Sequence, residues 1–229
     1  MMFVHTLQVS GKYLCREHIS KHCVFFNEIG KKNVLFLHKS GVMMLMGCYG
    51  DNCVAIYVLA AIYCKKLHCL NLAGLPLSSI GLRMLSTIAS NLRILNLDAC
   101  SGANDTNLQH LFQHCLKLES LTLSHICNLT GNCLTALAHA PLKELVMDGC
   151  ENLQSESLVG GICVHKNLLT LNLSLCTNLK SNDVQKIMDA VPWLRSLSME
   201  HFFPLFTSTT LIALGQLHDL TSLHLFKLL

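Results

Sequence analysis

LRILNLDACSGANDTNLQHLFQHC (Leu92–Cys115) and LLTLNLSLCTNLKSNDVQKIMDAV (Leu168–Val191) carry the pattern that decides the fold. Each opens with a leucine triad, Leu-x-x-Leu-x-Leu, whose last position also admits methionine. The triad occurs seven times, at Leu67/Leu70/Leu72, Leu92/Leu95/Leu97, Leu118/Leu121/Leu123, Leu142/Leu145/Met147, Leu168/Leu171/Leu173, Leu194/Leu197/Met199 and Leu220/Leu223/Leu225. The first leucines of successive triads are 25, 26, 24, 26, 26 and 26 residues apart. A period this regular is typical of stacked structural repeats.

Each repeat contains two kinds of apolar spacing. The last two residues of a triad are two positions apart and share one face of a short strand. The second half of the repeat changes to helical spacing, as at Leu108, Leu111 and Phe112, and at Leu134, Leu137 and Ala138. One strand and one helix are too small to bury their own apolar sides, so neighbouring repeats must stack. The sequence predicts an α/β solenoid with a curved parallel sheet inside and helices outside.

A cysteine-rich position follows each strand. The residue eight places after the first leucine is Leu75, Cys100, Ile126, Cys150, Cys176 or Phe202. We expect it to plug the core in the turn after the strand. Asparagines come shortly afterwards, at Asn128, Asn152 and Asn178, where their side chains can bond to nearby backbone groups.

These segments resemble the cysteine-containing leucine-rich repeats of F-box/LRR proteins. They are also similar to the related antagonist-of-mitotic-exit-network proteins, and the resemblance covers about residues 67–229. It implies a leucine-rich-repeat solenoid that binds proteins. In the F-box/LRR proteins the repeats hold the substrate of an SCF ubiquitin ligase, whereas the antagonist proteins suggest a repeat-only scaffold or regulator without a ligase link.

The two ends depart from the repeat pattern. We divide the chain into an atypical segment, residues 1–41, a degenerate repeat, 42–66, and seven leucine-rich repeats, 67–229, of which the last stops after its strand. Val42 and Leu45 precede Leu67 and Leu70 by 25 residues, and weaker echoes of the triad fall within residues 1–41. Because solenoids need capped ends, we expect the chain to be a fragment of a longer protein or to have its end covered by another chain.

The F-box module implied by the resemblance is not recognisable here. Such a module of roughly 40–45 residues begins near a Leu-Pro pair and has a late tryptophan. The first proline of this chain is Pro76 and the only tryptophan is Trp193, within the repeats. A Skp-type adaptor is therefore expected as a partner only if an F-box lies outside these residues.

Composition narrows the function classes. The chain has 17 basic and 14 acidic residues, a net charge of +3, which is too weak a bias to predict binding to nucleic acid or to a membrane surface. The most apolar window, Cys53–Cys64, is shorter than the about 20 residues that span a bilayer and is expected to be a buried helix. An odd count of 13 cysteines without a C-x-x-C pair indicates reduced thiols, which favours the cytoplasm or nucleus. Glycosylation sequons at Asn104, Asn128 and Asn172 support only an extracellular alternative.

Candidate metal or catalytic residues are weak. Cys15, His18, His22 and Cys23 have zinc-like spacing but lack a second pair of ligands, so a helix ending at a core Cys23 is the favoured interpretation. His110, His114 and Cys115 are better explained by a helix with Cys115 in the core. No phosphate-binding loop, dinucleotide motif or nucleophile elbow is present. We expect no enzyme activity, no cofactor and no metal.

The concave side of the sheet is the candidate binding face. Strand residues alternate, so those between the triad leucines should point outward, towards a protein partner. The predicted partner-binding residues are Asn71, Asn96, Asp98, Thr122, Ser124, Glu144, Asp148, Asn172, Ser174, Ser198, Glu200 and His224. These positions hold four carboxylates and no Lys or Arg. Two interpretations remain open for the column Ala73, Asp98, Ser124, Asp148, Ser174, Glu200 and Phe226: acceptors for turn backbone groups, or an acidic groove for a basic or polar segment of a partner.

Overall fold

The computed structural model describes residues 23–25, 34–38, 42–46, 66–201 and 207–225. Ten strands form one sheet in chain order. They are β1 (Cys23–Phe25), β2 (Val34–His38), β3 (Val42–Met46), β4 (Cys69–Asn71), β5 (Ile94–Asn96), β6 (Ser120–Thr122), β7 (Glu144–Val146), β8 (Thr170–Asn172), β9 (Ser196–Ser198) and β10 (Ser222–His224). The helices are α2 (Ser79–Ser86), η1 (Ala89–Asn91), α3 (Asp105–Phe112), η2 (Asn132–Leu137), α4 (Ser155–Ile162), α5 (Ser181–Ala190) and α6 (Ser208–Gly215).

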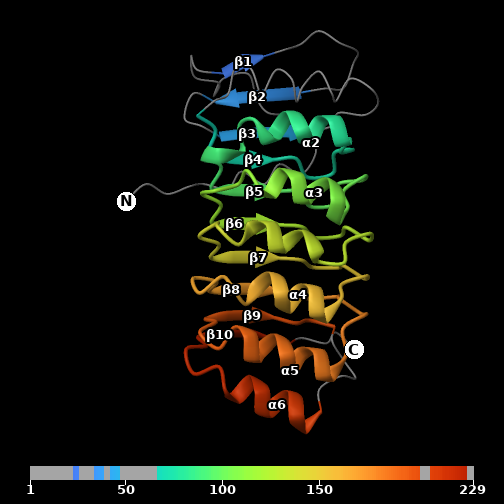
Figure 1. The fold of residues 1–229 in the computed structure, drawn as a ribbon, viewed down its shortest axis with the longest axis vertical. Coiled ribbons are helices and arrows are strands. Elements are labelled where there is room, and N and C mark those ends of the chain that lie inside the picture. The colour runs from blue at the N-terminus through green and yellow to red at the C-terminus, as the bar shows by residue number, and fades with distance from the viewer. Residues whose placement is uncertain (1–22, 26–33, 39–41, 47–65, 202–206, 226–229) are drawn as a thin grey trace, which may run out of the picture.

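Strands β4 to β10 are parallel and in register (Figure 1). The middle leucine of each triad pairs with its counterpart in the next repeat, as Leu70 does with Leu95 and Leu171 with Leu197. All triad residues of the first six repeats are buried and belong to one core. The chain therefore folds as an α/β leucine-rich-repeat solenoid, which confirms the predicted fold class.

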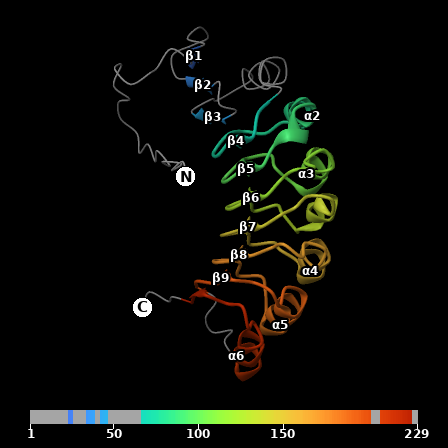
Figure 2. The same ribbon diagram turned by 90° about the vertical axis from the view of Figure 1, so that its left-hand side faces the viewer.

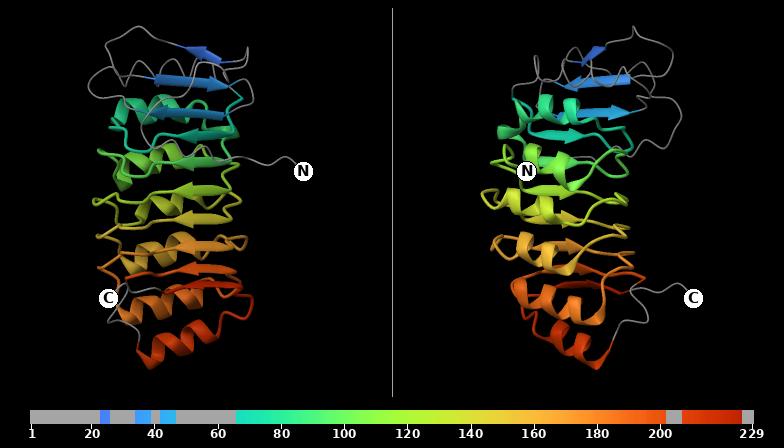
Figure 3. Two further views of the ribbon diagram at one scale, coloured as in Figure 1. Left: turned by 180° about the vertical axis from the view of Figure 1, so that it is seen from behind. Right: turned by 45° about the vertical axis from the view of Figure 1, so that its right-hand side comes forward.

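The strands and helices form two layers around that core. In Figure 2 the strands follow the inner side of a shallow arc and the helices follow its outer side. Figure 3 shows the strands side by side along the stack from the opposite direction. The side of β4–β10 that faces away from the helices is called the concave face below.

The sheet changes direction before the repeats. β1 pairs antiparallel with β2, and β2 pairs antiparallel with β3, whereas β3 lies parallel to β4. Met43 lies opposite Leu70, so the expected alignment of Leu45 with Leu70 was two residues out of register. Cys23 opens a strand instead of ending a helix. The apolar window Cys53–Cys64 and the ligand candidates Cys15, His18 and His22 lie outside the described residues, and the three-part division of the chain stays a prediction.

The shortest repeat has a different kind of helix. Its triad begins 24 residues before the next one, and its helical segment, η2, is a 3-10 helix of 6 residues where α3 has 8 in an α-helix. A 3-10 helix rises about 2.0 Å per residue and an α-helix about 1.5 Å, so both segments span about 12 Å. The tighter helix thus compensates for the two missing residues. It also leaves Ala138, expected in the core, exposed at the end of the segment.

The cysteines after the strands bond to the preceding repeat. Cys100, Cys150 and Cys176 are buried, and their thiols donate to the carbonyls of Leu72, Leu123 and Met147, with S···O distances of 3.0, 3.1 and 3.1 Å. Each acceptor is the last triad residue of the preceding repeat. Burial raises the pKa of these thiols to about 11, 11 and 12, respectively. The predicted core position is confirmed for the described residues, and Phe202 lies outside them.

Asparagine side chains also cross between repeats. Asn152 and Asn178 donate from Nδ2 to the carbonyls of Cys127 and Leu153, about one repeat earlier in the chain. The sequence placed these asparagines in a turn but did not reveal that their partners belong to the neighbouring repeat. Side-chain bonds therefore reinforce the stack at the turn as well as in the sheet.

Asp105 makes more hydrogen bonds to a neighbouring repeat than any of these cysteines and asparagines. Its carboxylate accepts from the backbone N–H groups of Thr130, Gly131 and Cys133, at 2.8, 3.1 and 2.9 Å, and from the Thr130 hydroxyl. These groups lie at the start of η2, where the N–H groups of a helix have no partners of their own. The bonds hold the pKa of Asp105 below its usual value against an opposing effect of burial, which is the largest single influence. One acid thus caps the helix of the next repeat.

The last described strand shows that burial of the triad leucines depends on stacking. Leu197 in β9 is 0% exposed, whereas Leu223, at the same position in β10, is 43% exposed. Within the described residues no further strand follows β10 in the sheet. Leu223 is therefore more exposed than its counterparts, because the burial of a triad leucine depends on a neighbouring repeat.

We predict that Asp105→Ala lowers the free energy of unfolding by about 1.5–3 kcal/mol, because three backbone donors lose a charged acceptor. Urea unfolding followed by circular dichroism at pH 7 measures the change. The control is Asp189→Ala, which removes an exposed carboxylate bonded only to Gln185 in the described structure and should stay within about 0.5 kcal/mol of the wild type. Equal losses in the two variants would contradict the capping role.

Candidate functional site

The predicted binding residues all lie on the concave face or at its edge, but they differ in access. Asn71, Asn96, Thr122, Glu144, Asn172 and Ser198 lie within the strands and are half-buried. Asp98, Asp148 and Glu200 follow their strands and are also half-buried, and His224 is exposed. Ser124 and Ser174 are only 4% and 5% exposed and offer little surface to a partner.

The asparagines of the face have structural partners. Asn71, Asn96 and Asn172 each accept, through Oδ1, the backbone N–H two residues ahead, at 2.9, 2.8 and 2.8 Å. This bond closes the turn at the end of the strand.

Ser174 is also structural. Its hydroxyl accepts the backbone N–H of Glu200 at 3.0 Å and lies 2.9 Å from the hydroxyl of Ser198. At Ser174 the geometry therefore agrees with the interpretation that this column accepts turn backbone groups.

The acidic members of the same column behave differently. Asp98 is paired through Oδ1 with His125 Nδ1 at 2.9 Å. Asp148 has one carboxylate oxygen, Oδ1, that is buried and has no hydrogen-bond partner among the described residues. Burial is the main cause that raises the pKa of Asp148, and Glu200 and Asp98 add to the effect, while His125 and His201 oppose it. The turn-backbone interpretation does not account for this carboxylate.

His125 lies between two of these acids. The hydrogen bond to Asp98 is the main cause that raises its pKa, partly offset by desolvation and increased again by the charges of Asp98 and Asp148. Its backbone has a left-handed φ of 56°, and its ring covers Gly149, where an added Cβ would lie 2.9 Å from Cδ2 of His125. A side chain at position 149 would displace the imidazole, so glycine there preserves the arrangement.

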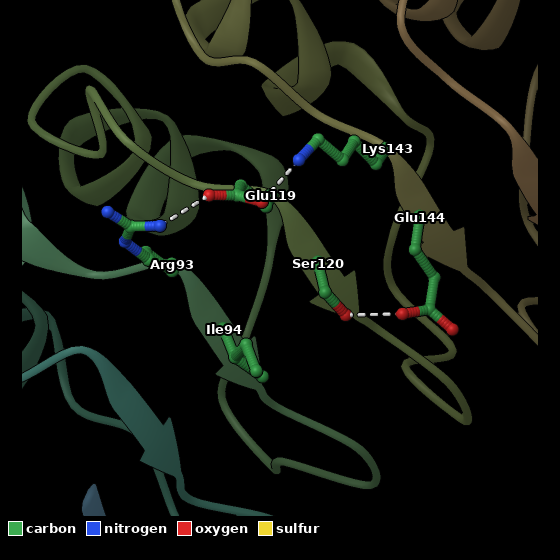
Figure 4. Close-up of a pocket in the computed structure, with 6 residues that line it drawn as sticks. All are labelled: Arg93, Ile94, Glu119, Ser120, Lys143 and Glu144. Atoms are coloured by element: carbon green, nitrogen blue, oxygen red, sulfur yellow. Dashed lines mark hydrogen bonds and ion pairs between the residues drawn. The ribbon is translucent and has the colours of Figure 1, made fainter. Parts of the chain in front are cut away.

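A second set of charged residues reaches the concave face and was not predicted from the sequence. Figure 4 shows a pocket lined by Arg93, Ile94, Glu119, Ser120, Lys143 and Glu144. Glu119 binds both cations, Arg93 at 3.1 Å and Lys143 at 2.6 Å. The Ser120 hydroxyl donates to Glu144 at 2.7 Å.

A bulge-like break in strand alternation explains these positions. The N–H groups of Arg93 and Ile94 both donate to the single carbonyl of His68, and the same pattern recurs one repeat later, from Glu119 and Ser120 to Arg93. Two consecutive N–H groups thus share one acceptor at the start of the strand, an arrangement similar to a β-bulge. Strict alternation did not include this first position among the outward-facing residues. The recurrence of Arg93, Lys143 and Arg195 directly after the first triad leucine was the available signal.

Other chemistry is limited in the described part of the chain. No group of three or more His, Cys, Asp or Glu residues among the described ones is arranged to hold a metal ion. No helix within that part is long and apolar enough to cross a membrane. The face instead offers amides, hydroxyls and charged side chains for noncovalent contacts.

A solved structure agrees with this fold. No protein-family model matches the chain. A chain in the structure of the Drosophila Toll–Spatzle complex aligns with 88% of this chain at 12% identity and a TM-score of 0.50. An internalin from Listeria monocytogenes aligns with 71% of it at 16% identity and a TM-score of 0.34. This chain covers 32% of the length of the first and 57% of the second. At such low identity the similarity to the Toll–Spatzle chain concerns the fold alone.

We predict that Asp98→Asn lowers the pKa of His125 towards the ordinary histidine value, because the charged hydrogen-bond acceptor is lost. A raised pKa in the folded state means that the pair stabilises the protein fully below the unfolded pKa, and that this contribution is lost as the pH rises through the folded pKa. Nuclear magnetic resonance titration of the imidazole measures the midpoint. Asp189→Asn, with an exposed acid on α5, should leave that midpoint unchanged, and an unchanged midpoint in Asp98→Asn would contradict the pairing.

Proposed function

We propose that the chain is a protein-interaction module that holds its partner on the concave face of β4–β10. The observation that carries this proposal is the face itself. It is a sheet surface that no described element covers, and its strand residues are mostly short and half-buried. Short side chains allow a partner to approach the sheet closely, while their hydroxyl and amide groups supply hydrogen bonds.

Charge on this face supports a specific partner. Carboxylates at Asp98, Asp148 and Glu200 border one edge, and Oδ1 of Asp148 is buried without a bonded donor among the described residues. The Asp98 side chain is 38% exposed, so its carboxylate can accept hydrogen bonds from a bound protein. Charge complementarity at such an edge would contribute more to specificity and to the association rate than to affinity.

We further propose that these repeats are the substrate-recognition part of an F-box/LRR type ubiquitin-ligase receptor. The support is the resemblance of the cysteine-containing repeats, together with buried thiols at Cys100, Cys150 and Cys176 that bond to the preceding repeat. In this role the concave face would hold the protein to be ubiquitinated, and a Skp-type adaptor would bind an F-box outside these residues. We further propose a location in the cytoplasm or nucleus, which the odd number of cysteines and the missing C-x-x-C pair support.

A repeat-only scaffold or regulatory binding protein is the alternative. It would use the same concave face and needs no adaptor. The two functions differ only in the second partner, so an experiment on that partner separates them.

To test the binding face, two arginines are placed on it, at Thr122→Arg with Thr170→Arg. Two arginines on the outer helices, Gln109→Arg with Asn182→Arg, form a control of equal charge, since both residues are exposed. Partners captured by the wild type are identified by mass spectrometry, purified, and measured by isothermal titration calorimetry. We expect the concave pair to weaken binding at least about tenfold, or about 1.4 kcal/mol, and the helix pair to change it less than about twofold. Equal effects of the two pairs would place the binding surface elsewhere.

To test the ligase link, the product of the complete gene is co-expressed with a Skp-type adaptor and purified. We expect a complex of equal stoichiometry by size-exclusion chromatography with light scattering. A product that binds its concave-face partner but elutes without the adaptor would support the scaffold.

A further inference from the structure

The charged edges of the concave face alternate between repeats. A cation follows the first triad leucine in three repeats, at Arg93, Lys143 and Arg195, and an acid follows the strand in the same three, at Asp98, Asp148 and Glu200. These repeats contain β5, β7 and β9. The repeats between them have neither feature: they carry Glu119 and Ser124, or Leu169 and Ser174, at the same two positions.

The spacing of these charges follows from sheet geometry. Adjacent strands lie about 4.8 Å apart, so charges on every second strand are about 10 Å apart along the stack. Along one repeat the cation and the acid are five residues apart, at most about 17 Å at 3.3 Å per residue. Backbone bonds between repeats continue from Arg93 to Ala99, so this stretch is extended. The face therefore has a basic edge and an acidic edge, and the strand residues between them are mostly short and polar.

An α-helix matches both dimensions. Its diameter with side chains is about 10–12 Å, which fits between edges about 17 Å apart. Seven residues advance about 10.5 Å and return a side chain to nearly the same side, which matches the 10 Å interval. In an extended strand, side chains on one side repeat at about 6.6 and 13 Å, and neither spacing matches the 10 Å interval.

We propose that the concave face binds an α-helix lying across the strands, with acidic side chains along one flank and basic side chains along the other, each repeating every seven residues. This inference rests on the proposed function, because it assumes a protein partner on that face. It adds the shape and the charge pattern of the segment that is recognised.

Both edges carry charged side chains that such a helix can contact. Arg93 and Lys143 share the single carboxylate of Glu119, so this group of three keeps a net positive charge, and the two cationic side chains remain 57% and 52% exposed. On the other edge the Asp98 side chain is 38% exposed beside His125, and Asp148 and Glu200 are half-buried. Glu144 offsets part of the charge on the basic edge, and His125 offsets part of the charge on the acidic edge. Reversing all three charges of one edge is therefore more informative than a single substitution.

The first experiment compares two peptide probes with the complete 229-residue chain. Both are 21-residue, alanine-rich, end-blocked helices of one composition, with three Glu and three Lys. In the matched probe the Glu and Lys residues occupy opposite flanks at intervals of seven, and in the control probe the intervals are five, so the charges wind around the helix. We expect the matched probe to bind about tenfold tighter by fluorescence anisotropy at low ionic strength, with the advantage lost at high salt. Equal affinities, or no binding of the matched probe, would overturn the inference.

The second experiment reverses the edges. The triple variants Arg93→Glu/Lys143→Glu/Arg195→Glu and Asp98→Lys/Asp148→Lys/Glu200→Lys should each bind the matched probe at least about fivefold more weakly. The variant with all six changes should recover binding, because the helix can turn end for end and present its flanks in the opposite order. A folded six-residue variant, checked by circular dichroism, that fails to recover would overturn the inference. The inference can fail here while the arginine pairs still locate a protein on this face, so the two proposals can be told apart.

Discussion

The leucine triad of one repeat is buried only where the next repeat covers it, and the rest of the structure depends on this constraint. Leu197 is fully buried beneath a following strand, and Leu223, in the same position of the last described strand, is not. Burying a leucine contributes about 1.5–3 kcal/mol, so six covered triads favour the stack strongly. Because each repeat must match the register of its neighbour, the outward side chains are forced into columns. The binding face is thus a by-product of how the core is completed.

Polar contacts between repeats occur where the columns meet the turns. The thiol of Cys150, the amide of Asn152 and the carboxylate of Asp105 each bond to the backbone of an adjacent repeat. None of these bonds lies within the sheet ladder. They satisfy backbone groups that the short strands and helices leave unpaired. A solenoid with three-residue strands has such groups at the turns between its elements.

The sequence predicted those features that follow from the periodic burial of apolar side chains. The seven triads, the parallel sheet and the core position of Cys100 follow from spacing alone, since apolar side chains must meet to be buried. Features that depend on backbone detail were not predictable. The 3-10 form of η2 accompanies a repeat of 24 residues, and that effect depends on helical rise. The register of Met43 against Leu70 depends on pairing with a segment that has no clear triad. The position of Arg93 at the binding face goes with backbone bonding just before the strand, which alternation does not reveal. Within the candidate site, the sequence located the columns but could not separate Ser174, which supports the turn, from Asp148, whose oxygen lacks a partner.

The helix η2 shows how such a protein can tolerate changes in repeat length. Two residues fewer in the repeat are absorbed by a change of helical pitch on the outer side, and β6 and β7 stay paired in register on the inner side. Insertions and deletions in the outer segment therefore need not disturb the columns of the concave face. In evolutionary terms, the length of a repeat and the chemistry of its binding surface can vary independently.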